Sequence, residues 1–103
     1  MTRLLVFEHS KSVRNNLCER LEFEGYSTVA VETPQAAADA LEAGQTDLII
    51  VDDVESLPES DIPFIVISGK SSLDSAVEAL RRGAVDYLTK PVDMNRQIGR
   101  EHV

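Results

Sequence analysis

Strand-like and helix-like segments alternate along this 103-residue chain, and that alternation restricts the folds open to it. Two of the strand-like segments, Asp47–Val51 and Phe64–Ile67, are continuous apolar runs, as expected of strands covered on both faces. Strands that alternate with helices lie parallel and are joined by right-handed crossovers. The sequence therefore predicts an α/β fold with a doubly wound, five-stranded parallel sheet, in a single domain that spans residues 1–103.

Five strands and four helices are expected from the apolar spacing and from the residues that end each segment. The strands are predicted over Arg3–Phe7, Thr28–Glu32, Asp47–Val51, Phe64–Ile67 and Ala84–Leu88. The helices are predicted over Ser12–Glu24, Pro34–Ala43, Ser71–Arg82 and Asp93–Glu101. Thr33 and Pro34 are an N-cap and a first helical residue, and Gly25 stands where the first helix should end.

The connection between the third and fourth strands is too short for a full helix. It contains only the twelve residues Asp52–Pro63, and two of them are proline. A parallel crossover needs roughly a dozen residues, so the chain can close with room for about one helical turn. We therefore expect the third crossover helix to be missing or reduced, and apolar surface to be exposed between the Pro34–Ala43 and Ser71–Arg82 helices. Because exposed apolar patches are usually covered, we expect a homodimer or a protein partner on this face.

Three predicted strands run into a polar side chain of a different kind. Asp52 supplies a carboxylate, Ser68 a hydroxyl and Lys90 an ammonium group. Because ligands collect at the carboxyl ends of parallel strands, these groups are expected to face one another. Such a set suits phosphoryl transfer, which asks mainly for positioning and charge neutralisation. Asp52 and Asp53 could instead be only two solvated acids at a strand end. That interpretation would not explain the hydroxyl of Ser68 and the ammonium of Lys90 at the neighbouring strand ends.

The composition limits the kinds of partner that this domain can bind and indicates the compartment in which it works. Eighteen acidic residues against ten basic ones give a net charge of −8, which argues against binding of nucleic acid or anionic membrane by this domain itself. The single cysteine, Cys18, excludes an intramolecular disulfide, and its spacing indicates a small buried side chain. Neither a signal-peptide pattern nor a membrane-span length of apolar residues is found, so we expect a cytoplasmic protein. A nucleotide- or flavin-binding protein is set aside, because no glycine-rich phosphate-binding motif occurs.

Three stretches together resemble the receiver domain of bacterial two-component response regulators. They are Thr46–Asp52, Pro63–Gly69 and Ala79–Pro91, and the likeness extends over about the first 93 residues. The resemblance implies a flavodoxin-like sheet with strand order 2-1-3-4-5 and a sensor histidine kinase as the phosphoryl donor. It implies a signalling domain rather than an enzyme, since its only catalysis is of its own phosphorylation and dephosphorylation. It also makes the Lys90–Pro91 bond a candidate cis peptide.

The resemblance implies a role for each matching residue. Asp52 is the implied phosphoacceptor, and Lys90 is implied to pair with the phosphoaspartate. Ser68 matches the hydroxyl residue that binds the phosphoryl oxygens. Gly69 matches a small position that leaves access to the aspartate, and Tyr87 matches the aromatic switch residue.

The implied metal site departs from the family pattern. The resemblance implies Mg²⁺ held by acids at the end of the first strand, by Asp52 and by the backbone carbonyl of Val54. Here that strand ends in Glu8 and His9 instead of two adjacent acids. Glu8 can contribute an oxygen through water, whereas Mg²⁺ prefers oxygen to the imidazole of His9; a cluster of His, Glu and Asp could instead accept a transition metal. The alternative function is a phosphorylation-independent pseudo-receiver that acts as a protein-interaction or dimerisation module.

Overall fold

Five parallel strands form one sheet in the order β2-β1-β3-β4-β5 in the computed structural model, which describes residues 2–69 and 73–89. The strands are β1 (Arg3–Phe7), β2 (Ser27–Val31), β3 (Leu48–Val51), β4 (Phe64–Ser68) and β5 (Asp86–Thr89). The helices are α1 (Lys11–Phe23), α2 (Pro34–Glu42) and α3 (Leu73–Arg81), with a 3₁₀ turn, η1 (Val54–Ser56). The predicted fold class and strand order are confirmed. The predicted helix over Asp93–Glu101 lies outside the described residues.

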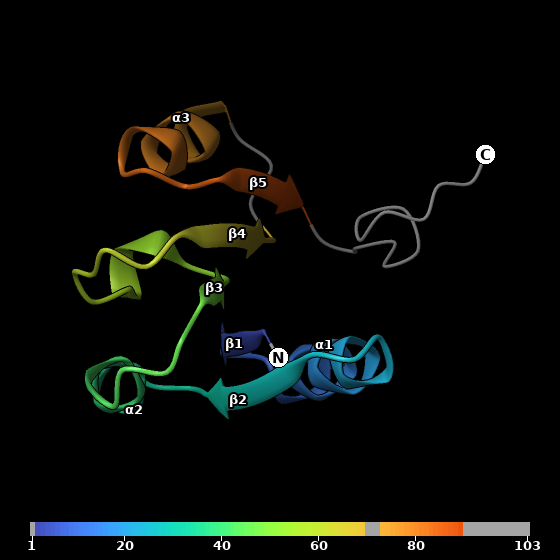
Figure 1. Ribbon diagram of the computed structural model, residues 1–103. Helices are drawn as coiled ribbons and strands as arrows, with labels where there is room; N and C mark the ends of the chain where they lie inside the picture. The colour runs from blue at the N-terminus through green and yellow to red at the C-terminus, as the bar shows by residue number, and fades with distance from the viewer. Residues whose placement is uncertain (1, 70–72, 90–103) are drawn as a thin grey trace.

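Helices cover both faces of the sheet. Figure 1 shows α1 on one side, and α2, η1 and α3 on the other. Successive side chains of a strand point to opposite faces, so β1, β3, β4 and β5 each contribute side chains to two apolar cores, one on each face. In β1, for example, Leu4 and Val6 pack with Leu17 and Leu21 of α1, whereas Phe7 belongs to the core beneath α2 and α3. This two-sided burial explains why the central strands are continuous apolar runs.

The first two helices lie within one residue of their predicted bounds: α1 begins and ends one residue earlier than predicted, and α2 begins at Pro34 as predicted and ends one residue early. The Thr33 side chain accepts a hydrogen bond from the backbone N–H of Ala36 at 3.1 Å, and Pro34 follows it as the first helical residue. Gly25 follows Glu24, the C-cap of α1, and has a φ of 101°, a left-handed conformation that favours glycine. The turn after α1 then leads directly into β2, the strand that pairs with β1.

The connection between β3 and β4 contains only the single turn η1, as predicted. The expectation that it leaves apolar sheet exposed is wrong. Val54, Leu57 and Ile62 of this connection pack against the core that also contains Phe64, so the loop itself covers the sheet. A loop can do this without helical periodicity because any backbone path that points an apolar side chain inward buries it. The sheet itself therefore gives no premise for a partner on this face, although Leu73, Val77 and Leu80 of the flanking helix α3 are exposed.

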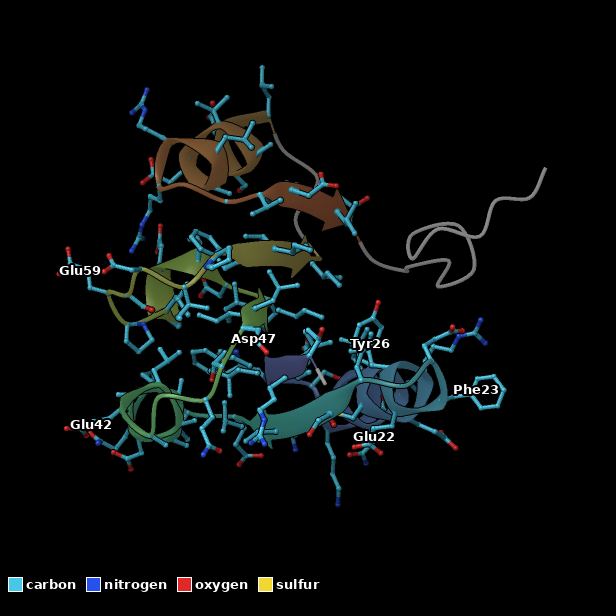
Figure 2. The ribbon with its side chains drawn as sticks, in the orientation of Figure 1. Glu22, Phe23, Tyr26, Glu42, Asp47 and Glu59 are labelled. Carbon is cyan, nitrogen blue, oxygen red and sulfur yellow. The ribbon has the colours of Figure 1, made fainter. Side chains whose placement is uncertain are left out.

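None of the large apolar side chains that the described residues expose belongs to this connection. They are Phe23, Val29, Leu73, Val77, Leu80 and Val85. Figure 2 shows the ring of Phe23 pointing away from the body of the protein at the end of α1. No helix within residues 2–69 and 73–89 combines the length and the apolar character that crossing a bilayer requires.

Candidate functional site

The strands β1, β3 and β4 end at one edge of the sheet, and a polar side chain stands at each end. Glu8 follows β1, Asp52 follows β3, and Ser68 is the last residue of β4. Parallel pairing of β1 with β3 and of β3 with β4 brings these ends level. Glu8 and Ser68 are buried, and the Asp52 side chain is only 12% exposed. Three of the predicted site residues therefore share a largely enclosed edge of the sheet.

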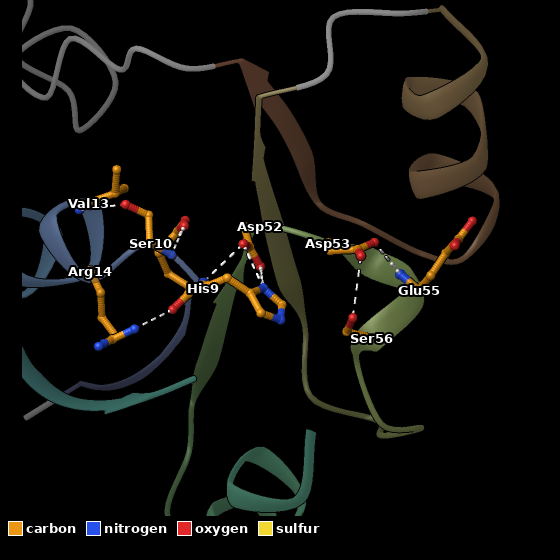
Figure 3. Close-up of polar contacts among 9 residues, drawn as sticks. His9, Ser10, Val13, Arg14, Asp52, Asp53, Glu55 and Ser56 are labelled. Atoms are coloured by element: carbon orange, nitrogen blue, oxygen red, sulfur yellow. Dashed lines mark hydrogen bonds and ion pairs between the residues drawn. The ribbon is translucent and has the colours of Figure 1, made fainter. Parts of the chain in front are cut away.

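Asp52 is held by His9 through both its backbone and its ring. The backbone N–H of His9 donates to Oδ2 of Asp52 at 3.0 Å, and Nδ1 of the ring lies 2.9 Å from Oδ2 and 3.1 Å from Oδ1. Figure 3 shows these contacts converging on the carboxylate from the β1 side. Because a carboxylate only accepts hydrogen bonds, Nδ1 of His9 carries the proton.

The ring of His9 is fixed from a second direction. It lies against the ring of Phe7, with the two centroids 5.5 Å apart, although half of the His9 side chain is exposed. The hydrogen bond to Asp52 raises the pKa of His9 above its usual value of 6.5, against the opposing effect of burial. The negative charges of Asp52, Asp53 and Glu8 raise that pKa further.

Glu8 is directed into its own loop. Its Oε2 accepts the backbone N–H of Ser10 at 2.9 Å, and Ser10 in turn caps α1 by accepting the N–H of Val13. Arg14 donates from Nη1 to the backbone carbonyl of Glu8 at 2.8 Å. These contacts tie the carboxyl end of β1 to the first turn of α1, so the backbone that carries His9 is fixed at both ends.

The two adjacent acids after β3 have different partners. Asp53 accepts the backbone N–H of Glu55 at 3.1 Å and the hydroxyl of Ser56 at 3.3 Å, which makes it the cap of η1. Asp52 instead faces His9 across the edge of the sheet, as Figure 3 shows. The carboxylate that stands at the shared strand edge is therefore that of Asp52.

A small cavity beside Asp52 brings together residues from several elements. Asp52, Ser68 and Tyr87 line it, three residues that the sequence singled out. Ser75 and Glu78 of α3 line the same cavity and were missed by the sequence analysis. Their spacing of three residues places both on one face of a helix, which is a signal that could have found them once α3 was known to face the site.

Comparison with known proteins identifies the family. No family model matches the chain. Among curated proteins, response regulator protein FleR of Pseudomonas aeruginosa is 30% identical over 105 residues, covering 88% of this chain and 22% of FleR. Response regulator MprA of Mycolicibacterium vanbaalenii is 26% identical over 110 residues, covering 95% of this chain and 48% of MprA. The chain thus spans about half, or less, of the length of the curated relatives it matches.

A solved receiver domain supports the same assignment: the signal receiver domain of a putative LuxO repressor protein from Vibrio parahaemolyticus is 27% identical and superposes with a TM-score of 0.80, over 94% of this chain and 84% of that one. A response regulator protein from Burkholderia pseudomallei, 22% identical, has the same fold, with a TM-score of 0.82 over 100% of this chain and 68% of that one. The chain is a response-regulator receiver domain. Its short connection between β3 and β4, with one 3₁₀ turn in place of a helix, makes it an atypical one.

Of the remaining predicted site residues, the structure describes Gly69. Gly69 follows Ser68, and a Cβ added there would meet nothing within 4 Å, so packing does not require glycine at this position. Lys90 and the Lys90–Pro91 bond lie outside the described residues and stay predictions. The residue before Lys90, Thr89, pairs with Ser68 in the β4–β5 register.

The donors of this receiver do not fit Mg²⁺. Within the described part of the chain, no three or more His, Cys, Asp or Glu side chains are grouped to hold a metal ion. The carbonyl of Val54, the predicted backbone ligand, accepts the N–H of Leu57 at 3.2 Å within the turn η1. Mg²⁺ demands near-octahedral oxygen ligands, whereas the position beside Asp52 holds the imidazole of His9.

Proposed function

We propose that this receiver domain accepts a phosphoryl group on Asp52 from a phosphohistidine of a sensor histidine kinase and then presents an altered surface to a protein partner. The observation that carries the proposal is the cavity in which Asp52, Ser68 and Tyr87 meet. The likeness to response regulators supports it, as does the phosphorylated aspartic acid that the Burkholderia pseudomallei structure contains. A cytoplasmic location is proposed on the same likeness.

The chemistry is a transfer between two side chains. An oxygen of Asp52 attacks phosphorus, the bond between phosphorus and the donor's imidazole nitrogen breaks, and an acyl phosphate forms on Asp52. The transferring group passes through a loose transition state, so the protein contributes mainly position and charge. No step is assigned to a divalent cation, because the described donors form no oxygen site for one.

The residues around Asp52 can bind the phosphoaspartate that the reaction forms. The hydroxyl of Ser68 can donate a hydrogen bond to a phosphoryl oxygen in the cavity. Tyr87 lines the same cavity from β5, so a group that fills it reaches the ring and can shift it. We propose Lys90, which follows the partner of Ser68 in the strand register, as the cation that pairs with the phosphoaspartate.

The domain is proposed to act as a signalling module and not as an enzyme with a separate substrate. A homodimer or another protein partner on the Asp52–Pro63 face stays a prediction, and Val54, Leu57 and Ile62 already cover the sheet there.

Intact-mass measurement after incubation with phosphoramidate tests the proposal, because its phosphorus–nitrogen bond mimics that of phosphohistidine. The wild-type protein should gain one phosphoryl group, and Asp52→Asn should not. Asp53→Asn is the matched control: it changes the neighbouring acid in the same way and should retain the adduct. An adduct that persists in Asp52→Asn would refute the assignment. Absence of any adduct, with or without divalent cations, would point to the pseudo-receiver.

A further inference from the structure

His9 occupies the side of Asp52 that faces the end of β1, where Glu8 could add a second oxygen to a cation site. Three contacts of 2.9 to 3.1 Å, one from the backbone and two from the ring, lead from His9 to the carboxylate. Mg²⁺ binds carboxylate oxygen at about 2.1 Å. An ion placed at that distance on this side of Asp52 would overlap the ring nitrogen, so imidazole and cation exclude each other here.

Two of the oxygens that could complete such a site already accept hydrogen bonds within their own loops. Oε2 of Glu8 accepts the N–H of Ser10, and the carbonyl of Val54 accepts the N–H of Leu57. The ring of His9 is also restrained by Phe7, with 5.5 Å between the ring centroids. Displacement of His9 would thus break contacts with both Phe7 and Asp52 and would still leave a nitrogen ligand, which Mg²⁺ disfavours.

We propose that His9 takes the place of the cation in this receiver: its N–H groups hold Asp52, the wild-type protein does not bind Mg²⁺ beside Asp52, and a carboxylate at position 9 is sufficient to create a Mg²⁺ site. The backbone N–H of residue 9 donates to Asp52 whatever the side chain, so a substitution keeps the backbone contact. An aspartate at this position would add an oxygen ligand next to Glu8 and Asp52. The inference concerns the unphosphorylated protein and does not rest on the proposed phosphoryl transfer.

Titration of the full chain with Mg²⁺, followed by backbone amide NMR, tests the inference directly. His9→Asp should bind Mg²⁺ at least about ten-fold more tightly than the wild type, since even outer-shell substitutions change metal affinity roughly 10–100-fold. The shifted amides should be those around Glu8, residue 9 and Asp52. The matched control His9→Asn, which removes the ring without adding a charge, should bind no better than the wild type. Addition of Glu8→Gln to His9→Asp should reverse the gain.

Thermal unfolding gives an independent readout that does not need phosphorylation. A ligand that binds only the folded state raises the melting temperature, so millimolar Mg²⁺ should stabilise His9→Asp and leave the wild type unchanged. His9→Glu serves as a second acidic variant should His9→Asp fail to fold. Wild-type protein that binds Mg²⁺ at these amides as tightly as His9→Asp would overturn the inference. So would folded acidic variants that gain no Mg²⁺ affinity.

Discussion

Truncation of Val54 tests whether the short β3–β4 connection covers the sheet as a crossover helix would. The side chain is 8% exposed and packs in the core beneath α2 and α3. Val54→Ala removes two methyl groups, each worth about 0.8 kcal/mol when fully buried. With this degree of burial, the expected loss in the free energy of unfolding is about 1.5 kcal/mol, and the cavity left behind increases it.

Val85→Ala is the matched control, because the same two methyl groups are removed from a side chain that is 62% exposed. The same arithmetic gives a loss of about 0.6 kcal/mol or less. In a domain of this size, the stability lost in Val54→Ala corresponds to a fall in melting temperature of about 6–12 °C. The difference in stability between Val54→Ala and Val85→Ala thus shows whether the β3–β4 connection is part of the core or leaves the sheet exposed.

Urea unfolding followed by far-UV circular dichroism measures both variants, since the chain has no tryptophan. Under two-state conditions the midpoint should shift in Val54→Ala with an unchanged dependence on urea concentration. A Val54→Ala protein that loses no more stability than Val85→Ala would refute the reasoning. The sheet face would then be exposed in solution, and a partner on it would again be expected.

Three further predictions concern the site itself. Asp53→Ala should lower the free energy of unfolding by about 0.5–2 kcal/mol through loss of the cap on η1, which urea unfolding will show; no change would mean that the cap is not formed. Asp52→Asn should lower the pKa of His9, followed by NMR of its ring protons. The folded-state pKa of His9 is raised above 6.5, so the His9–Asp52 pair stabilises the folded protein below about pH 6.5 and this stabilisation is lost as the pH rises through the folded-state pKa. An equal His9 pKa in the wild type and in Asp52→Asn would contradict the contact. Ser68→Ala should reduce the phosphoryl adduct roughly 2–10-fold, the worth of one hydrogen bond, whereas Gly69→Ala, whose methyl meets nothing, should fold and react normally. Equal adducts in the two variants would remove Ser68 from the site.

The fold could be predicted from local patterns because those patterns report burial. Continuous apolar runs indicated β3 and β4, and the cap at Thr33 fixed the start of α2. The face of α3 could not be predicted in this way. Val77 and Leu80 support a helix by their spacing, yet both are exposed, and the fully buried residue is Ala79. Spacing identifies a helix, whereas the contacts of that helix with the sheet decide which of its sides is buried.

The strand ends could be located from the sequence, but the directions of their side chains could not. Asp52 and Asp53 are chemically identical neighbours, and only the path of the loop makes one a cap and leaves the other at the sheet edge. The same holds for the Asp52–Pro63 connection. Its apolar residues follow no regular period, so no pattern could indicate that they pack inward.

The charges around Asp52 bear on both phosphorylation and the role of His9. A phosphoryl group brings roughly two negative charges to a site that needs cations around it. The described residues that line the cavity beside Asp52 include Asp53, Glu55 and Glu78 but no lysine or arginine. If His9 excludes Mg²⁺, His9 itself and the proposed Lys90 are the candidates to supply the positive charge. Mg²⁺ titration of the His9 variants tests whether His9 excludes the cation. The phosphoramidate reaction tests whether the remaining positive charges are sufficient for phosphorylation of Asp52.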